Sequence, residues 1–260
     1  MPAGPAPALL EAFGLERRRY VHLIGGGGKT ALMFAAAGAL VAVGRTVLTT
    51  TSTRILWPGP DETPCVVQGA EAAALIERLR AEFARHAHVT ALAPAPGGTR
   101  KAVGLPPAVL DALFAADVAG HVLVEADGSA GRPLKAHREH EPVVSARADL
   151  VIAVVGVTCL GAPMDDAHVH RAALLRERLG RPADARVEPG DVAAILLGPG
   201  GWLERTGGAD VVAFLNQADT PARRAAGRAL AAALRGRDRE GRLARVVVGD
   251  VREGAFEVVG

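Results

Sequence analysis

A run of four glycines lies between a short apolar stretch and an alanine-rich stretch, at Gly25, Gly26, Gly27 and Gly28. Because glycine has no Cβ, such a run lets successive backbone N–H groups turn toward one point. The alanine-rich stretch has the composition of a helix, and the N-terminal end of a helix carries a partial positive charge. The run therefore constrains the chain to a strand, a tight loop and a helix, and it predicts a phosphate-binding loop.

The two residues after the glycines fit this interpretation. Lys29 would reach the outer phosphates of a nucleotide, and the hydroxyl of Thr30 would bind Mg²⁺. The match to the pattern G-x-x-x-x-G-K-[ST] is incomplete, because Leu23 stands where the pattern has its first glycine. The loop is thus a shortened variant, and the alternative is a glycine-rich turn that only connects a strand to a helix.

Apolar runs alternate with helical patterns along the chain. Runs typical of buried strands occupy residues 20–24, 46–49, 65–68, 122–125, 150–155, 211–215 and 245–248, and helical patterns occupy 30–43, 70–85, 107–116, 167–179 and 222–235. Strands without apolar/polar alternation are typical of a sheet covered on both faces. We therefore expect a three-layer α/β/α, P-loop NTPase-like fold with a mainly parallel sheet, a loop at 93–99, and a hairpin or edge strand within 246–259.

Length and composition set the class of protein. With 260 residues and 49% hydrophobic content, the chain can bury a full core, and we expect one domain over residues 1–260 with a loosely ordered segment at 1–18. A net charge of +2 without a long basic run gives no argument for nucleic acid as a partner. No signal peptide or membrane-spanning stretch is evident, so we expect a cytoplasmic protein with no membrane partner. Cys65 and Cys159 lack C-x-x-C spacing and are interpreted as ordinary thiols.

Two carboxylates follow the apolar run near residue 122. Glu125 and Asp127 stand two positions apart, with Gly128 next, which is a Walker B-like arrangement. At the carboxyl end of a strand beside the phosphate loop, Asp127 would hold Mg²⁺, and either carboxylate could orient a nucleophile. We therefore name Lys29, Glu125 and Asp127 as candidate catalytic residues. The alternative is a strand that ends in an ordinary Asp-Gly turn.

A run of hydroxyl residues, T-T-T-S-T, ends at Arg54 at the same predicted edge of the sheet. Thr50 and Thr51 are candidates to contact a metal-bound water, and Arg54 could bind phosphate or substrate. The alternative is that these β-branched residues only extend a strand.

The sequence N-Q-x-D, from Asn216 to Asp219, follows another apolar run and is similar to the guanine-reading N-K-x-D element of GTP-binding proteins. Gln217 replaces the lysine of that element, so the base could be that of ATP or of GTP. The alternative is a turn in which Asp219 or Thr220 caps a helix before Pro221.

Eight histidines raise the question of a metal site. The candidates cluster in the middle of the chain, at His137, His140, Glu141, His168 and His170. Their spacings match no zinc signature, so we interpret them as surface residues or as partners of other side chains.

Several motifs together resemble the YqeC family. They are G-G-G-G-K-T, T-T-T-S-T, E-A-D-G-S-A-G-R-P-L-K-A continuing to H-E-P-V, G-V-T-C-L-G, V-H-R and F-L-N-Q-A-D, which span about residues 20 to 219. Cys159 and Ala130 depart from the family's pattern. Members are described as accessory proteins of selenium-dependent molybdenum hydroxylases, so the resemblance implies nucleotide binding and a role in maturation of such an enzyme.

Residues at family-like positions also suit a second ligand site, and the alternative is that Arg132 and Lys135 lie in a solvated loop. The candidate residues of this site lie in the middle block and in the V-H-R motif, at Arg132, Lys135, His140, Glu141, His170 and Arg171. Three functions stay open at this point: a Mg²⁺-dependent NTPase or nucleotide-dependent transferase, a non-catalytic nucleotide-gated chaperone or delivery protein, and a small-molecule kinase that acts on a cofactor precursor.

Overall fold

The apolar runs of the sequence form one nine-stranded sheet in the computed structural model, which describes residues 5–95 and 100–259. The strands of this sheet are β1 Tyr20–Gly25, β2 Val47–Thr51, β4 Val66–Gln68, β5 His88–Leu92, β7 His121–Glu125, β9 Leu150–Gly156, β11 Asp210–Asn216, β12 Leu243–Asp250 and β13 Ala255–Val258. Their spatial order is β13-β12-β11-β9-β1-β7-β2-β5-β4. All neighbours are parallel except β12 and β13, so the expected C-terminal edge strand is an antiparallel hairpin partner.

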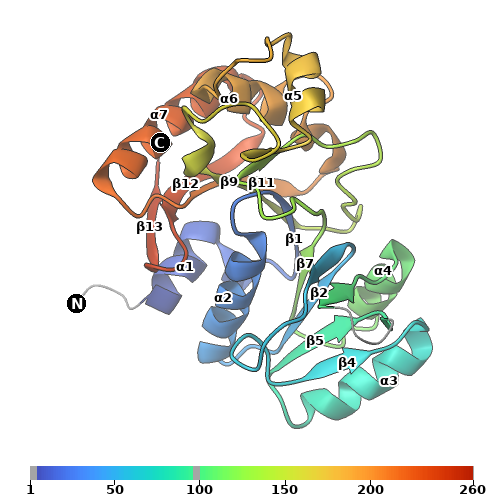
Figure 1. Ribbon diagram of the computed structural model, residues 1–260. Coiled ribbons are helices and arrows are strands. Elements are labelled where there is room, and N and C mark those ends of the chain that lie inside the picture. Colours follow the sequence, from blue (N-terminus) through green and yellow to red (C-terminus); the bar gives the residue numbers. More distant parts are fainter. Residues whose placement is uncertain (1–4, 96–99, 260) are drawn as a thin grey trace.

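Helices cover both faces of the sheet (Figure 1). They are α1 Pro5–Phe13, α2 Lys29–Ala42, α3 Ala72–Phe83, α4 Pro107–Ala115, α5 Ala172–Leu179, α6 Pro189–Leu197 and α7 Pro221–Arg237. Alternate residues of a strand point to opposite faces. In β1, Val21 and Leu23 therefore pack with α1 and α2, whereas Tyr20 packs with α3 and α4, and Ile24 with α6 and α7. The central strand is thus buried on both faces, and all its residues are buried, the polar His22 among them.

Two small sheets lie outside the large one. Strands β3 Arg54–Leu56 and β6 Lys101–Val103 pair antiparallel, and β8 Leu134–Lys135 and β10 Val169–His170 pair parallel. The second pair joins the middle block of the sequence to the V-H-R motif. Short 3-10 helices occupy Leu15–Arg17, Val157–Cys159 and Trp202–Arg205.

Two sequence-based expectations need correction. Within the segment expected to be loosely ordered, residues 5–13 form α1, whose Leu9, Leu10 and Phe13 are buried against α2 and the sheet. The helix expected over 167–179 begins only at Ala172, because residues 169–170 pair in β10 and Arg171 takes a left-handed conformation. Of the loop expected at 93–99, residues 96–99 lie outside the described residues.

Candidate functional site

The glycine run lies at the carboxyl end of β1 and leads directly into α2 (Figure 1). The first hydrogen bond of this helix runs from the N–H of Leu32 to the carbonyl of Gly28, at 3.0 Å. The N–H groups of Lys29, Thr30 and Ala31 come before this bond, so they have no acceptor within the helix. They form a donor-rich helix end beside the side chains described below.

The N–H groups of the first three glycines of the run already donate within the protein. The N–H of Gly25 donates to the Asp127 carboxylate at 2.9 Å, that of Gly26 to the carbonyl of Val154 at 2.8 Å, and that of Gly27 to the carbonyl of Arg132 at 2.9 Å. A Cβ on Gly27, whose φ is 78°, would overlap the backbone of Gly156. Close packing therefore demands glycine in the first part of the run. The N–H groups for which the described residues offer no acceptor belong to the helix end.

Lys29 is buried and turned back into the protein. Its Nζ donates to the carbonyl of Gly25 at 2.6 Å and lies 3.2 Å from Asp127 and 3.6 Å from Glu125. Burial lowers the pKa of Lys29, but the two carboxylates more than offset this effect, and the net pKa is raised. Lys29 is therefore a cation in a site almost without solvent.

Glu125 and Asp127 converge on Lys29 although β7 ends at Glu125. The hydroxyl of Thr30 donates to Glu125 Oε2 at 2.6 Å, so Glu125 is the carboxylate that contacts Thr30. Burial raises the pKa of Glu125, and the opposing effects of Lys29 and Thr30 do not fully compensate it.

Asp127 is surrounded by donors. Besides Lys29 and the N–H of Gly25, it contacts His137 Nε2 and lies 3.4 Å from Lys135 Nζ. Burial would raise the pKa of Asp127, but Lys29, His137 and Lys135 hold it well below its ordinary value. Asp127 is thus a permanent anion whose oxygens already have partners within the protein.

The predicted residues of the second ligand site extend this network outward. Lys135 Nζ lies 3.3 Å from Glu141, and Arg171 pairs with both oxygens of Glu141, with Nη2 at 2.9 Å from Oε1. Burial raises the pKa of Glu141, but Arg171 and Lys135 outweigh it and lower the value to about 2. His170 is half-buried, and burial together with Arg171 and Lys135 lowers its pKa.

The resulting cluster is balanced in charge. Three basic side chains, Lys29, Lys135 and Arg171, face three acidic ones, Glu125, Asp127 and Glu141. Burial also lowers the pKa of His137, which favours its neutral form. An added anion and an added cation would therefore preserve this balance best if they bound together.

Other predicted residues lie differently. Thr50 and Thr51 are buried, and their hydroxyls donate to the carbonyls of Ala91 and Glu125, both at 2.8 Å. These hydroxyls join neighbouring strands. Arg54 lies exposed on β3, and His140 is exposed as well.

Arg132 contacts the glycine run through its backbone. Its carbonyl accepts the N–H of Gly27, while its Nε donates to the carbonyl of Asp166 at 2.7 Å. Its guanidinium therefore binds the loop that contains Asp166, whereas its backbone carbonyl binds the glycine run.

The N-Q-x-D residues divide between the loop and the surface. Asn216 is buried and donates from Nδ2 to the carbonyl of Gly27 at 2.7 Å, and it accepts the N–H of Val251 at 3.1 Å. Asp219 pairs with Arg223 at 2.7 Å on the surface, and Thr220 is the residue that caps α7. Asn216 thus links the glycine run to the residue that follows β12 by hydrogen bonds.

Sequence reasoning did not place Trp202 in the site, and it named His137 only as a surface residue or a partner of other side chains. His137 contacts Asp127, and Trp202 packs against His137 with ring centroids 4.9 Å apart. A Cβ on Gly25 would overlap the Trp202 ring. Nothing near Trp202 in the sequence indicates its place.

Fold and site together define a mixed α/β protein in which a glycine-rich loop and a helix end face a buried, charge-balanced cluster. The model of the YqeC protein family matches residues 21–173. Over 203 residues the chain is 32% identical to the uncharacterized protein YqeC of Escherichia coli (strain K12), a match that covers 76% of this chain and 75% of that protein. The chain belongs to the YqeC family.

Within residues 5–95 and 100–259, no helix combines the length and the apolar character needed to cross a membrane.

Proposed function

We propose that this chain is a P-loop NTPase-like protein that binds a nucleoside triphosphate together with Mg²⁺ and acts as an NTPase or nucleotide-dependent transferase. The nucleotide phosphates would lie at the N-terminal end of α2, within reach of Lys29. In this proposal the nucleotide state serves the maturation of a molybdenum hydroxylase, the role that the family resemblance implies.

The contact between Thr30 and Glu125 is the observation that carries the proposal. A hydroxyl from the first turn of α2 and a carboxylate from the neighbouring strand β7 meet at 2.6 Å. Hydroxyl and carboxylate oxygens are ligands that Mg²⁺ accepts, usually with phosphate oxygens and water beside them. These residues fit a magnesium ion, and the ion would supply neutralisation of phosphate charge.

The charge balance of the cluster supports joint binding. Nucleotide alone would add anionic charge beside Glu125 and Asp127, and Mg²⁺ alone would add cationic charge beside Lys29. Both additions are costly in a buried site. Lys29 would turn from the two carboxylates toward the phosphates, while the cation would take over part of its present pairing.

Calorimetry with ATP, GTP and their diphosphates, with and without Mg²⁺, tests the proposal. We expect a triphosphate to bind at least about tenfold more tightly with Mg²⁺, a difference of about 1.4 kcal/mol. Thr30→Val should remove most of this gain, whereas Thr30→Ser should keep it because the hydroxyl remains. Binding that ignores both Mg²⁺ and Thr30→Val would contradict the proposal.

The same titrations identify the base. If GTP binds selectively and Asp219→Ala removes the preference, N-Q-x-D reads guanine. If ATP binds, or if neither base is preferred, Asp219 has only the surface pairing with Arg223 that the structure contains.

Turnover assays separate the proposed activity from the alternatives. Phosphate release or group transfer that Lys29→Ala abolishes supports an NTPase or transferase. A nucleotide-gated delivery protein would instead bind a molybdenum hydroxylase apoenzyme differently in the triphosphate and diphosphate states, without turnover of its own. Phosphorylation of a cofactor precursor, detected by mass, would identify a kinase.

A further inference from the structure

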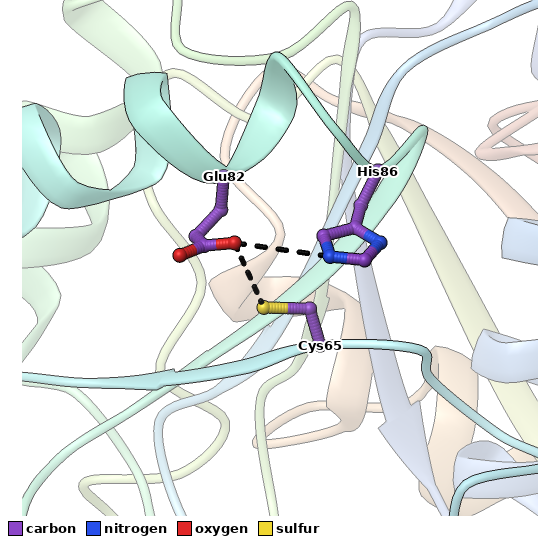
Figure 2. A group of neighbouring side chains, drawn as sticks. All are labelled: Cys65, Glu82 and His86. Atoms are coloured by element: carbon purple, nitrogen blue, oxygen red, sulfur yellow. Dashed lines mark hydrogen bonds and ion pairs between the residues drawn. The ribbon is translucent and has the colours of Figure 1, made fainter.

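Three side chains with metal-binding atoms meet at the edge of the sheet, far along the strand order from the glycine run. Cys65 directly precedes the edge strand β4, Glu82 lies in the last turn of α3, and His86 follows that helix. Figure 2 shows the thiol, the carboxylate and the imidazole pointing toward a common centre. All three side chains are half-buried.

Two of the three distances between these atoms are close to those of a tetrahedral site. Cys65 Sγ lies 3.7 Å and His86 Nε2 lies 3.8 Å from the same oxygen, Glu82 Oε2, and the three atoms lie within 4.8 Å of one another. Bonds of about 2.0–2.3 Å around tetrahedral Zn²⁺ place neighbouring ligands about 3.3–3.5 Å apart. Side-chain movements of a few tenths of an ångström would therefore suffice to bring the oxygen to both partners.

We propose that Cys65, Glu82 and His86 form a site for a zinc-class transition-metal ion, with a water as fourth ligand. The combination of sulfur, nitrogen and oxygen donors selects this class, because Mg²⁺ and Ca²⁺ prefer oxygen ligands alone. Cys65 is the cysteine suited to this role, since Cys159 is fully buried in the core. This assignment replaces the interpretation of Cys65 as an ordinary thiol.

Binding exchanges a proton for a metal–sulfur bond. Cys65 is a thiol in the metal-free protein, because burial and the adjacent Glu82 raise its pKa. The metal binds the thiolate, and the thiol proton passes to the buffer. The ion would join the start of β4 to the end of α3 and so pin the edge strand to the helix that covers it.

Titration of reduced, tag-free protein with Co²⁺ tests the site directly. We expect saturation at one equivalent, a thiolate-to-cobalt charge-transfer band in the near ultraviolet, and bleaching of the spectrum by Zn²⁺. In weakly buffered solution, release of about one proton per metal ion should accompany binding.

Cys65→Ser and His86→Ala should each weaken metal binding at least about 100-fold. Loss of a residue that only hydrogen-bonds to a metal ligand already weakens binding about 10- to 100-fold, and loss of the ligand itself should cost more. Cys159→Ala and His168→Ala are the matched controls and should bind as the unaltered protein does. Circular dichroism of each metal-free variant establishes that it is folded.

Three outcomes would overturn the site: no charge-transfer band in the folded protein, unchanged binding by both ligand variants, or loss of the band in Cys159→Ala alone. None of these measurements uses a nucleotide, so they are independent of the proposed function.

Discussion

Asp127 carries a negative charge on a side chain that has no exposed surface. Its partners include two buried lysines, Lys29 and Lys135, so the Asp127→Asn variant would leave both without their shared counter-ion. Removal of one member of a buried ion pair costs about 3–5 kcal/mol. We expect Asp127→Asn to lower the free energy of unfolding by that amount in urea at neutral pH.

Asp165→Asn is the matched control, because Asp165 pairs with His168 at the half-exposed surface. Its effect should stay within about 0.5 kcal/mol. Equal, small effects of the two variants would contradict the account of the cluster.

Burial of a neutral histidine should make stability depend on pH. Both ring nitrogens of His22 lack a partner among the described residues, and burial lowers its pKa from 6.5 to about 4. The unfolded chain therefore binds a proton first as the pH falls, so this contribution to stability is complete above about 6.5 and is lost toward about 4. We expect the free energy of unfolding to decrease over that interval.

His22→Leu should reduce this pH dependence by up to about 1.4 kcal/mol per pH unit, since one titrating group is removed. Urea unfolding at a series of pH values measures both slopes. Burial also lowers the pKa of His88 to about 4. The variant should therefore retain part of the pH dependence of its free energy of unfolding. Identical slopes for the two proteins would exclude His22 as a cause.

The sequence predicted that Glu125 and Asp127 lie near Lys29, because the carboxyl ends of neighbouring parallel strands lie at one edge of the sheet. The structure contains both contacts. The sequence could not show that Asp127 is already paired with Lys135 and His137, since those contacts depend on how the following loop folds back. Which carboxylate lies beside Thr30 is likewise a matter of side-chain packing.

At the scale of elements, the strands buried on both faces were the most predictable. Every residue of β9 is buried, and so is every residue of β11 except Asp210. The apolar runs of these two strands therefore indicate a strand clearly. Strand β5 was not predicted from the sequence, because it contains the polar residues His88 and Thr90. Both of these side chains form hydrogen bonds with the Thr49 hydroxyl inside the sheet. Its polar residues satisfy one another and so obscure a buried strand.

Two helices were also missed. Helix α6 begins with a capping box of Glu188 and Asp191 around a proline, a signal that the sequence does contain. Helix α1 is short, and what holds it is tertiary contact: Phe13 meets Phe214 and Phe256 edge-on, at centroid distances of 5.0 and 5.6 Å. Such contacts with distant segments have no signal in the local sequence.

Phe13→Ala tests whether α1 is an integral part of the fold. The ring is 2% exposed, and truncation of a buried phenylalanine costs about 3–5 kcal/mol. We expect a loss of that size in urea unfolding, with Glu11→Ala on the exposed side of the same helix within about 0.5 kcal/mol of the unaltered protein. A loosely attached helix would give small effects for both variants.

At the scale of the whole molecule, the sheet connects three groups of buried side chains. The group beneath α1 and α2 shares strands β1, β9, β11 and β12 with the group beneath α6 and α7, and shares β7 with the group beneath α3 and α4. Because each shared strand contributes alternate residues to both sides, loss of one group would expose the others. This arrangement favours a single cooperative unit, as the sequence predicts for residues 1–260.

The two tryptophans allow this to be measured, because they lie in different parts of the fold. Trp202 is fully buried beside Gly25 and His137, whereas Trp57 is 42% exposed just after β3. In Trp57→Phe, fluorescence reports on Trp202 alone, and far-ultraviolet circular dichroism reports on all helices and strands. We expect the two signals to give the same urea midpoint and slope. A Trp202 transition that precedes the loss of secondary structure would instead show that the part of the fold around Trp202 opens separately, and the chain would then consist of more than one folding unit.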